Sequence, residues 1–450
     1  MERIQSQPPR DSGDALDPAG PPAPVAAVDP VSGVDARVAL AQALDVPAGS
    51  LGEYARGWLK RARGGESGAL PVLIALAAIV VFFQAKNSLF LSAGNLINLL
   101  IQGAPYILLG MAEVFVLLLG EIDLSIGFVA GIGGVITAAL IASPHNFPWW
   151  AGVLAALAGT AAIGALQGSL ITRLRLPSFV VTLAGLLGWE GVLIEIISLS
   201  GSASGGTISI APNGIIYDIT AGNLSPTMSW VVMVAIVAAF GTVVMMRDGR
   251  RRANMLTAPL GLSLLKIGAA AVAGVVVVLV ANTDRGVAEP VRGLPWVVLI
   301  VLGLLAAWTL LLGRTRFGRY VYAIGGSPEA ARRAGVNLTK IRTLAFTLTG
   351  LTAGIAGIVY ASRLGSISTN VDGGSLVLYA VAAAVIGGTS LFGGRGKMLH
   401  AVLGGLVVAT IYNGLGLIGM DAATQYIVTA IVLLAAVIID TVARRGQRAK

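Results

Sequence analysis

The sequence predicts an all-α fold: a polytopic transmembrane helix bundle of about 10–12 spans with both termini in the cytoplasm. Of its 450 residues, 56% are hydrophobic and 12% are charged, whereas a soluble domain is about 25% charged. The mean hydropathy is +0.83, and many apolar runs approach the roughly 20 residues that cross a bilayer as a helix. Open strands would leave backbone groups unpaired in lipid, and the alternating pattern of a membrane barrel is missing from the sequence.

Twelve apolar segments are the candidate spans of this bundle. They are 69–86, 95–119, 125–142, 149–171, 179–199, 229–246, 264–281, 295–313, 343–361, 376–391, 399–419 and 424–441. The segments from 376 onward are short and interrupted by glycine, which is compatible with one re-entrant segment among them. Together they make up one membrane domain, residues 69–441.

The distribution of Lys and Arg predicts which ends of the spans face the cytoplasm. If both termini lie inside, the inner segments hold 27 of the 31 Lys and Arg residues. The outer segments hold only Lys86, Arg285, Arg292 and Arg363. Because cytoplasmic loops of membrane proteins are enriched in basic residues, this bias supports the orientation.

The chain outside the membrane domain divides into three parts. Residues 1–48 are rich in Pro, Ala, Asp and Gly without a long apolar run, which predicts a disordered cytoplasmic tail and no secretory signal. Within 49–68, Leu51, Tyr54 and Trp58 recur at helical spacing among basic residues, as in an amphipathic helix that binds membrane lipid. Residues 442–450 form a basic cytoplasmic tail.

Several kinds of chemistry lack their residues in this sequence. There is no cysteine, and His145 and His400 lie far apart, which favours interfacial polar residues over a metal site. GGRGKM at 393–398 is no Walker loop, since Leu391 and Met398 stand where Gly and Ser or Thr are needed. We therefore predict no catalytic site, metal or cofactor in this chain. The net charge of +9 reports membrane topology and does not indicate nucleic-acid binding.

The longest outer segment, residues 200–228, contains no Lys or Arg and many turn-forming residues. It fits a docking surface for an extracytoplasmic partner and a plain connector equally well.

The inner segment 314–342 is too long for a simple turn and contains SPEAARRAG. Ser327 can cap a helix, Pro328 suits its first turn, Glu329 complements its positive end and Gly335 can end it. The pattern predicts a helix of about two turns over 328–334, which alone would be marginal in water. Its alanines, Ala330, Ala331 and Ala334, could pack into a groove of another protein, or the helix could lie on lipid through Arg332 and Arg333.

The segment GEIDLSIG, residues 120–127, places two carboxylates inside an apolar region. In the favoured interpretation it is a break between spans, where Asp123 caps the next helix with help from Ser125 and Glu121 faces water at the inner boundary. The main alternative places Glu121 or Asp123 along a translocation pathway, since ionisable groups at membrane depth are usually functional. A proton relay is the third and least favoured interpretation.

Other polar residues within the spans are candidates for contact with a polar solute. They are Asn95, Asn98, Gln102, Glu190, Tyr412 and Asn413. Each is better explained by a hydrogen bond between helices than by ligand contact.

Three motifs together resemble one family. FGRYVYAIGGSPEAARRAGV is similar to the cytoplasmic coupling loop of monosaccharide-type permeases of bacterial ABC importers, and Glu329-Ala330-Ala331 with Gly335 resembles their EAA signature. GEIDLSIG and the segment VIGGTSLFGGRGKMLHAVLGG resemble two further blocks of the family. The xylose-type branch is the most similar, and the resemblance spans about 50–441.

The resemblance implies a membrane subunit that works with partners. It implies a permease homodimer, an ATPase subunit that holds ATP and Mg²⁺, and an extracytoplasmic sugar-binding protein. The residues it implies for coupling to the ATPase are Ser327, Pro328, Glu329, Ala330, Ala331, Arg332 and Gly335. The implied function is import of a monosaccharide, such as the pentose xylose, across the bacterial inner membrane. The alternatives are an ABC permease for a nucleoside, autoinducer or branched-chain amino acid, and an ion-coupled secondary carrier.

Overall fold

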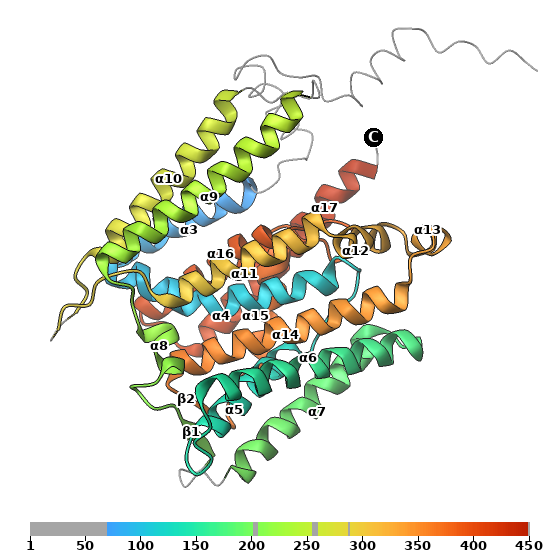
Figure 1. The fold of residues 1–450 in the computed structure, drawn as a ribbon, viewed down its shortest axis with the longest axis horizontal. Coiled ribbons are helices and arrows are strands. Elements are labelled where there is room, and N and C mark those ends of the chain that lie inside the picture. The colour runs from blue at the N-terminus through green and yellow to red at the C-terminus, as the bar shows by residue number, and fades with distance from the viewer. Residues whose placement is uncertain (1–69, 201–205, 254–259, 287–288, 449–450) are drawn as a thin grey trace, which may run out of the picture.

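The computed structural model describes residues 70–200, 206–253, 260–286 and 289–448, which form a bundle of long helices (Figure 1). The predicted tail 1–48 and amphipathic helix 49–68 lie outside the described residues. The helices of the first half are α3 Leu70–Lys86, α4 Ala93–Leu117, α5 Ile126–Ile141, α6 Trp149–Arg173, α7 Ser178–Leu199, α8 Ile215–Ala221 and α9 Pro226–Ala253. Those of the second half are α10 Leu260–Asn282, α11 Trp296–Arg314, α12 Arg316–Gly326, α13 Pro328–Arg333, α14 Leu338–Leu364, α15 Gly373–Ile386, α16 Met398–Leu417 and α17 Ala422–Arg448.

Each of the twelve predicted spans coincides with a helix, which confirms the polytopic all-α fold class. Eight of the described helices are long and apolar enough to cross a membrane, and α3, α5, α15 and the start of α17 are shorter apolar helices. With 14 residues, α15 measures about 21 Å, less than the roughly 30 Å of a bilayer core. It begins at residue 373, before the predicted start at 376. The last helix, α17, continues to Arg448, so most of the predicted tail 442–450 is helical.

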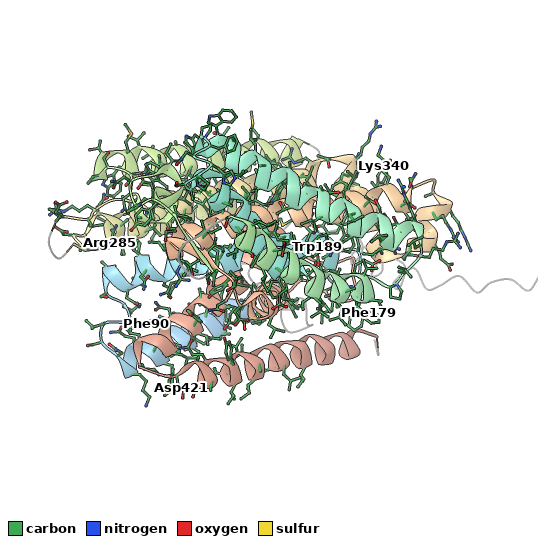
Figure 2. The ribbon with its side chains drawn as sticks, turned by 90° about the horizontal axis from the view of Figure 1, so that it is seen from below. Phe90, Phe179, Trp189, Arg285, Lys340 and Asp421 are labelled. Carbon is green, nitrogen blue, oxygen red and sulfur yellow. The ribbon has the colours of Figure 1, made fainter. Side chains whose placement is uncertain are left out.

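Two ends of the bundle can be distinguished. We call the end that carries α12 and α13 the inner end, following the charge distribution, and the opposite end, with α8 and the strands, the outer end (Figure 1). Figure 2 shows Lys340 at the inner end and Arg285 and Asp421 at the outer end. This placement agrees with the predicted sides of the membrane.

The predicted outer segment 200–228 carries structure of its own. It contains the strand β1 Thr207–Ser209, which pairs antiparallel with β2 Ser366–Ser368, and the helix α8. Ser362 Oγ donates to Tyr217 O at 3.1 Å and lies 2.9 Å from Thr220 Oγ1, which ties α8 to α14. The segment is therefore anchored to the bundle and is more than a plain connector.

The core of the bundle lies around α14, which packs against α4, α5 and α6. Glycines allow these helices to approach closely. A Cβ added at Gly357 would fall on the carbonyl oxygen of Ala130 in α5, and one at Gly350 on that of Thr160 in α6. Such contacts hold helices together in lipid, where hydrophobicity does not.

Candidate functional site: the inner helix α13, the buried carboxylates and the outer tyrosines

The predicted coupling helix is present as α13, at the inner end of the bundle (Figure 1). Ser327 Oγ accepts a hydrogen bond from the amide of Ala330 at 3.3 Å, and Pro328 occupies the first turn. After the helix, Gly335 has a φ of +81°, a conformation that favours glycine. These local features confirm the predicted helix and its boundaries.

One face of α13 is turned toward its own bundle, which corrects the predicted alanine ring. Ala331 is 4% exposed, whereas Glu329, Ala330 and Arg332 are exposed. Glu329 lies 4.0 Å from Arg333, and both side chains are largely exposed. A partner can therefore contact the acidic and basic rim of α13 but cannot contact all three alanines.

The preceding helix, α12, was not predicted from the sequence and connects α13 to the bundle. Its buried residues Val321 and Ile324 recur at helical spacing. Tyr322 Oη donates to the carbonyl of Gly396 at 2.8 Å. α12 therefore packs against α11, α13 and α14 and connects α13 to the bundle through a helix and not through an open loop.

The GEIDLSIG segment is buried from Ser125 onward and at Asp123, which corrects part of the favoured interpretation. Asp123 is 2% exposed and does not cap α5, because the helix begins only at Ile126 and its N-cap residue, Ser125, makes no side-chain cap bond. Glu121 does not face open water either: its side chain is 14% exposed and lies 3.6 Å from Arg342. The segment is a break between helices, with Gly120 at a φ of +76°.

Asp123 instead belongs to a buried polar network near the inner end. Its Oδ1 accepts from the Ser125 amide at 2.9 Å and from Ser125 Oγ at 2.6 Å. Its own amide donates to Glu113 Oε1 at 3.2 Å, and Gln167 Nε2 donates to Ser125 Oγ at 2.7 Å. Glu113 is fully buried. Asp123 and Ser125 were singled out from the sequence but Glu113 was not, and its only signal was a charged residue within the apolar run MAEVFV. The network joins α4, α5 and α6.

We expect Asp123→Ala to destabilise the protein by about 1–3 kcal/mol, because the buried Ser125 amide and hydroxyl would lose their acceptor. Asp123→Asn, which retains one acceptor oxygen, should cost less. Thermal unfolding in detergent and uptake per folded molecule measure the two effects. An alanine variant with unchanged stability and abolished uptake would contradict the structural role and favour the pathway interpretation.

Three of the predicted polar candidates contact each other near the outer end. Asn95 Nδ2 donates to Asn413 Oδ1 at 2.9 Å, and Asn413 Nδ2 donates to Gln102 Oε1 at 3.2 Å. These bonds join α4 to α16, as the interpretation of hydrogen bonds between helices predicted. Asn98 is exposed, and Glu190 is half-buried on α7, away from this group.

Sequence reasoning named Tyr412 as a candidate but missed Tyr106 and Tyr379, which form a cluster with it beside these amides. The ring centroids of Tyr106 lie 4.9 Å from Tyr379 and 5.9 Å from Tyr412, so residues from α4, α15 and α16 meet. Each tyrosine alone looks like an ordinary residue of an apolar run. A tyrosine in several spans was the only available signal.

A cavity of about 670 Å³ lies next to the cluster, between α15 and α17. Tyr426 Oη donates to Asp372 Oδ2 at 2.7 Å, and the Ser375 amide donates to Asp372 Oδ1 at 3.0 Å. Burial would raise the pKa of Asp372, but the hydrogen bonds from Ser375 and Tyr426 outweigh it and hold the pKa below its usual range. The cavity therefore presents a carboxylate, hydroxyls and the aromatic ring of Tyr379.

The fold and these sites define a class: a polytopic helical membrane protein with an exposed short helix, α13, at the inner end. Toward the outer end it has a largely apolar cavity that contains Asp372, Tyr379 and Tyr426. Residues 95–437 match the family described as the branched-chain amino acid transport system / permease component. The match covers most of the chain, so this protein belongs to that family of transport permeases.

Curated relatives cover most of the chain as well. A xylose transport system permease protein of Haemophilus influenzae is 35% identical over 376 residues, which are 82% of this chain and 95% of the relative. The xylose transport system permease protein of Escherichia coli K12 is 35% identical, over 83% of this chain and 92% of the relative. The ribose import permease protein of the same strain is 31% identical, over 82% and 92%. No solved structure matches the chain.

Proposed function

We propose that this chain is the membrane-spanning subunit of an ATP-driven importer that carries a monosaccharide, and more specifically a pentose such as xylose. The observation that carries the proposal is the identity of 35% with xylose permeases over more than four fifths of the chain. The importer class also agrees with the exposed, capped helix α13, which an ion-coupled carrier would not need.

The outer cavity is the proposed contact site for the sugar. Sugars present hydroxyls and apolar C–H faces, and sites for them combine a few polar groups with aromatic walls. Asp372 and Tyr426 can bond hydroxyls, and the ring of Tyr379 can pack against the C–H face. Gln102 in α4 and Asn413 in α16 each lie nearer the outer end than the tyrosine of the same helix, Tyr106 and Tyr412 respectively, and could bond hydroxyls as the sugar enters. Selectivity would remain weak here if a binding protein selects the sugar first.

The inner end is the proposed contact site for the ATPase. Ser327, Pro328, Glu329, Ala330 and Arg332 form or flank the exposed part of α13, and Gly335 sets the direction of the chain after it. Two copies of this permease would form the pathway between them. ATP and Mg²⁺ would be held by the ATPase, whose closure would carry α13 along and alternate the opening of the bundle.

Reconstitution tests the proposal. Vesicles that contain this chain, its ATPase and its binding protein should accumulate xylose only when ATP is present on the side of the membrane to which the ATPase is bound. Leucine replaces xylose in a parallel assay, because the family description includes branched-chain amino acid transport. Accumulation by the chain alone, driven by a proton or sodium gradient, would overturn the importer class. Leucine uptake without xylose uptake would overturn only the substrate.

A further inference from the structure

An arginine-lined cavity of about 630 Å³ lies at the inner end, between the α6–α7 turn and the start of α14. Arg175 of the turn, Arg332 of α13 and Arg342 of α14 line it, and Glu121 is the one carboxylate among the lining residues. Three guanidinium groups and one carboxylate give the lining a formal charge of +2. The cavity is therefore suited to an anion.

The charges of this cavity are only partly neutralised within the protein. Glu121 lies 3.6 Å from Arg342, and the two side chains are 14% and 25% exposed. In the part of the chain that the structure describes, neither Arg175 nor Arg332 lies within ion-pair distance of a carboxylate. The Nε of Arg342 is also buried without a hydrogen-bond partner among the described residues. Two guanidinium groups and one buried N–H remain for a ligand.

Arg175 is held in an unusual backbone conformation at the edge of the cavity. Its φ is 56°, in the left-handed region that side chains other than that of glycine adopt at a cost. Such strain persists where the surrounding structure imposes it and often marks a functional position. Here it accompanies an arginine that lines the cavity.

The residues beside Arg175 indicate that the cavity borders lipid. Leu174 is 61% exposed and Leu176 is 40% exposed. Both helices that meet at this turn, α6 and α7, are long and apolar enough to cross a membrane, so the turn lies at the inner membrane surface. Phe179, 55% exposed at the start of α7, lies toward the same end as Lys340 (Figure 2). Exposed apolar side chains next to guanidinium groups match the boundary between acyl chains and headgroups.

We propose that this cavity binds the phosphate group of an anionic phospholipid in the inner leaflet. Guanidinium groups bind phosphate oxygens through paired, charge-assisted hydrogen bonds. Basic pockets between transmembrane helices on the cytoplasmic side are suited to anionic headgroups. Leu174 and Leu176 would contact the acyl chains, while Arg175 and the Nε–H of Arg342 would contact the phosphate. The proposal does not depend on the transported substrate.

Lipid binding to the purified full-length chain in detergent tests the proposal. Native mass spectrometry would compare phosphatidylglycerol with phosphatidylcholine, and glycerol 3-phosphate would represent the headgroup without acyl chains. We expect at least a tenfold preference for phosphatidylglycerol over phosphatidylcholine, and much weaker binding of glycerol 3-phosphate. Equal binding of both lipids, or binding of glycerol 3-phosphate as tight as that of the lipid, would overturn the lipid site.

Variants of neighbouring arginines separate the cavity from general surface charge. Arg175→Gln should lower phosphatidylglycerol binding at least fivefold. Arg173→Gln removes the same charge from the last residue of α6, which is exposed and does not line the cavity, and should change binding less than twofold. Equal losses in both variants would overturn the site, since they would indicate surface charge alone.

Arg175→Gly provides a second test, because glycine adopts the left-handed backbone conformation of this position without strain. We expect a higher melting temperature in lipid-free detergent together with loss of the preference for phosphatidylglycerol. If Arg175→Gln left lipid binding intact but weakened ATPase association, the cavity would accept an acidic side chain of the ATPase and the lipid proposal would be wrong.

Discussion

Gly335→Pro should abolish the coupling of ATP hydrolysis to uptake while leaving the bundle folded. Proline fixes φ near −65° and has no N–H, whereas Gly335 has a φ of +81° and donates to Arg332 O at 3.0 Å. The substitution would change the direction of the chain between α13 and α14, so α13 would no longer be held in a fixed orientation relative to α14. We expect uptake to fall about tenfold or more, since the loss of about 1.4 kcal/mol of interaction between α13 and the ATPase already corresponds to a factor of ten.

The measurement compares xylose uptake with ATP hydrolysis in vesicles that contain the ATPase and the binding protein. Gly335→Asn is the matched control, because asparagine tolerates the left-handed conformation better than other residues with side chains. Gly326→Ala is a second control, since an added Cβ there meets nothing within 4 Å. Both should retain most of the uptake. Normal uptake by Gly335→Pro would contradict the assignment of α13 as the coupling element.

Gly357→Ala should destabilise the whole bundle, although alanine favours helices. In α14 the new Cβ would fall on the carbonyl oxygen of Ala130, and that backbone belongs to α5 and cannot move aside as a side chain would. Overpacking of a close contact costs about 1–3 kcal/mol and occasionally more. We expect a loss of stability at the upper end of this range, because α14 and α5 would have to move apart. Thermal unfolding in detergent and the yield of monodisperse protein measure the effect.

Gly268→Ala in α10 is the control, for which we expect a change in stability of the opposite sign. An added Cβ at Gly268 meets nothing within 4 Å, and replacing glycine by alanine in a helix is favourable by about 0.5–1 kcal/mol. Its stability should therefore rise slightly or remain unchanged. Similar melting temperatures for the Gly357 and Gly268 variants would show that the close approach of α14 and α5 is not needed for stability.

The membrane class, the order of spans and their orientation follow from local patterns in the chain. An apolar run of sufficient length forms a helix whatever its neighbours, and the bias of Lys and Arg toward one side sets its direction. The coupling helix is equally local, because Ser327, Pro328 and Gly335 act within a few residues of one another. The unpredicted helix α12 also has an N-cap, Thr315, whose Oγ1 accepts from the Gly318 amide at 3.2 Å. Its three glycines, Gly318, Gly325 and Gly326, disfavour a helix, which explains why it was missed.

Contacts between distant segments were decided by the tertiary structure alone. Asp123 was expected to cap a helix, yet its partners include Glu113, whose Oε1 accepts from the Asp123 amide, and Gln167 reaches the same network from α6. Asn95 and Asn413 bond across 318 positions of sequence, and three tyrosines meet from three helices. Which face of a helix meets which neighbour depends in lipid on close fit and paired polar groups, because hydrophobicity does not select among apolar faces. That fit is spread over residues far apart in the chain, so only the folded bundle reveals it.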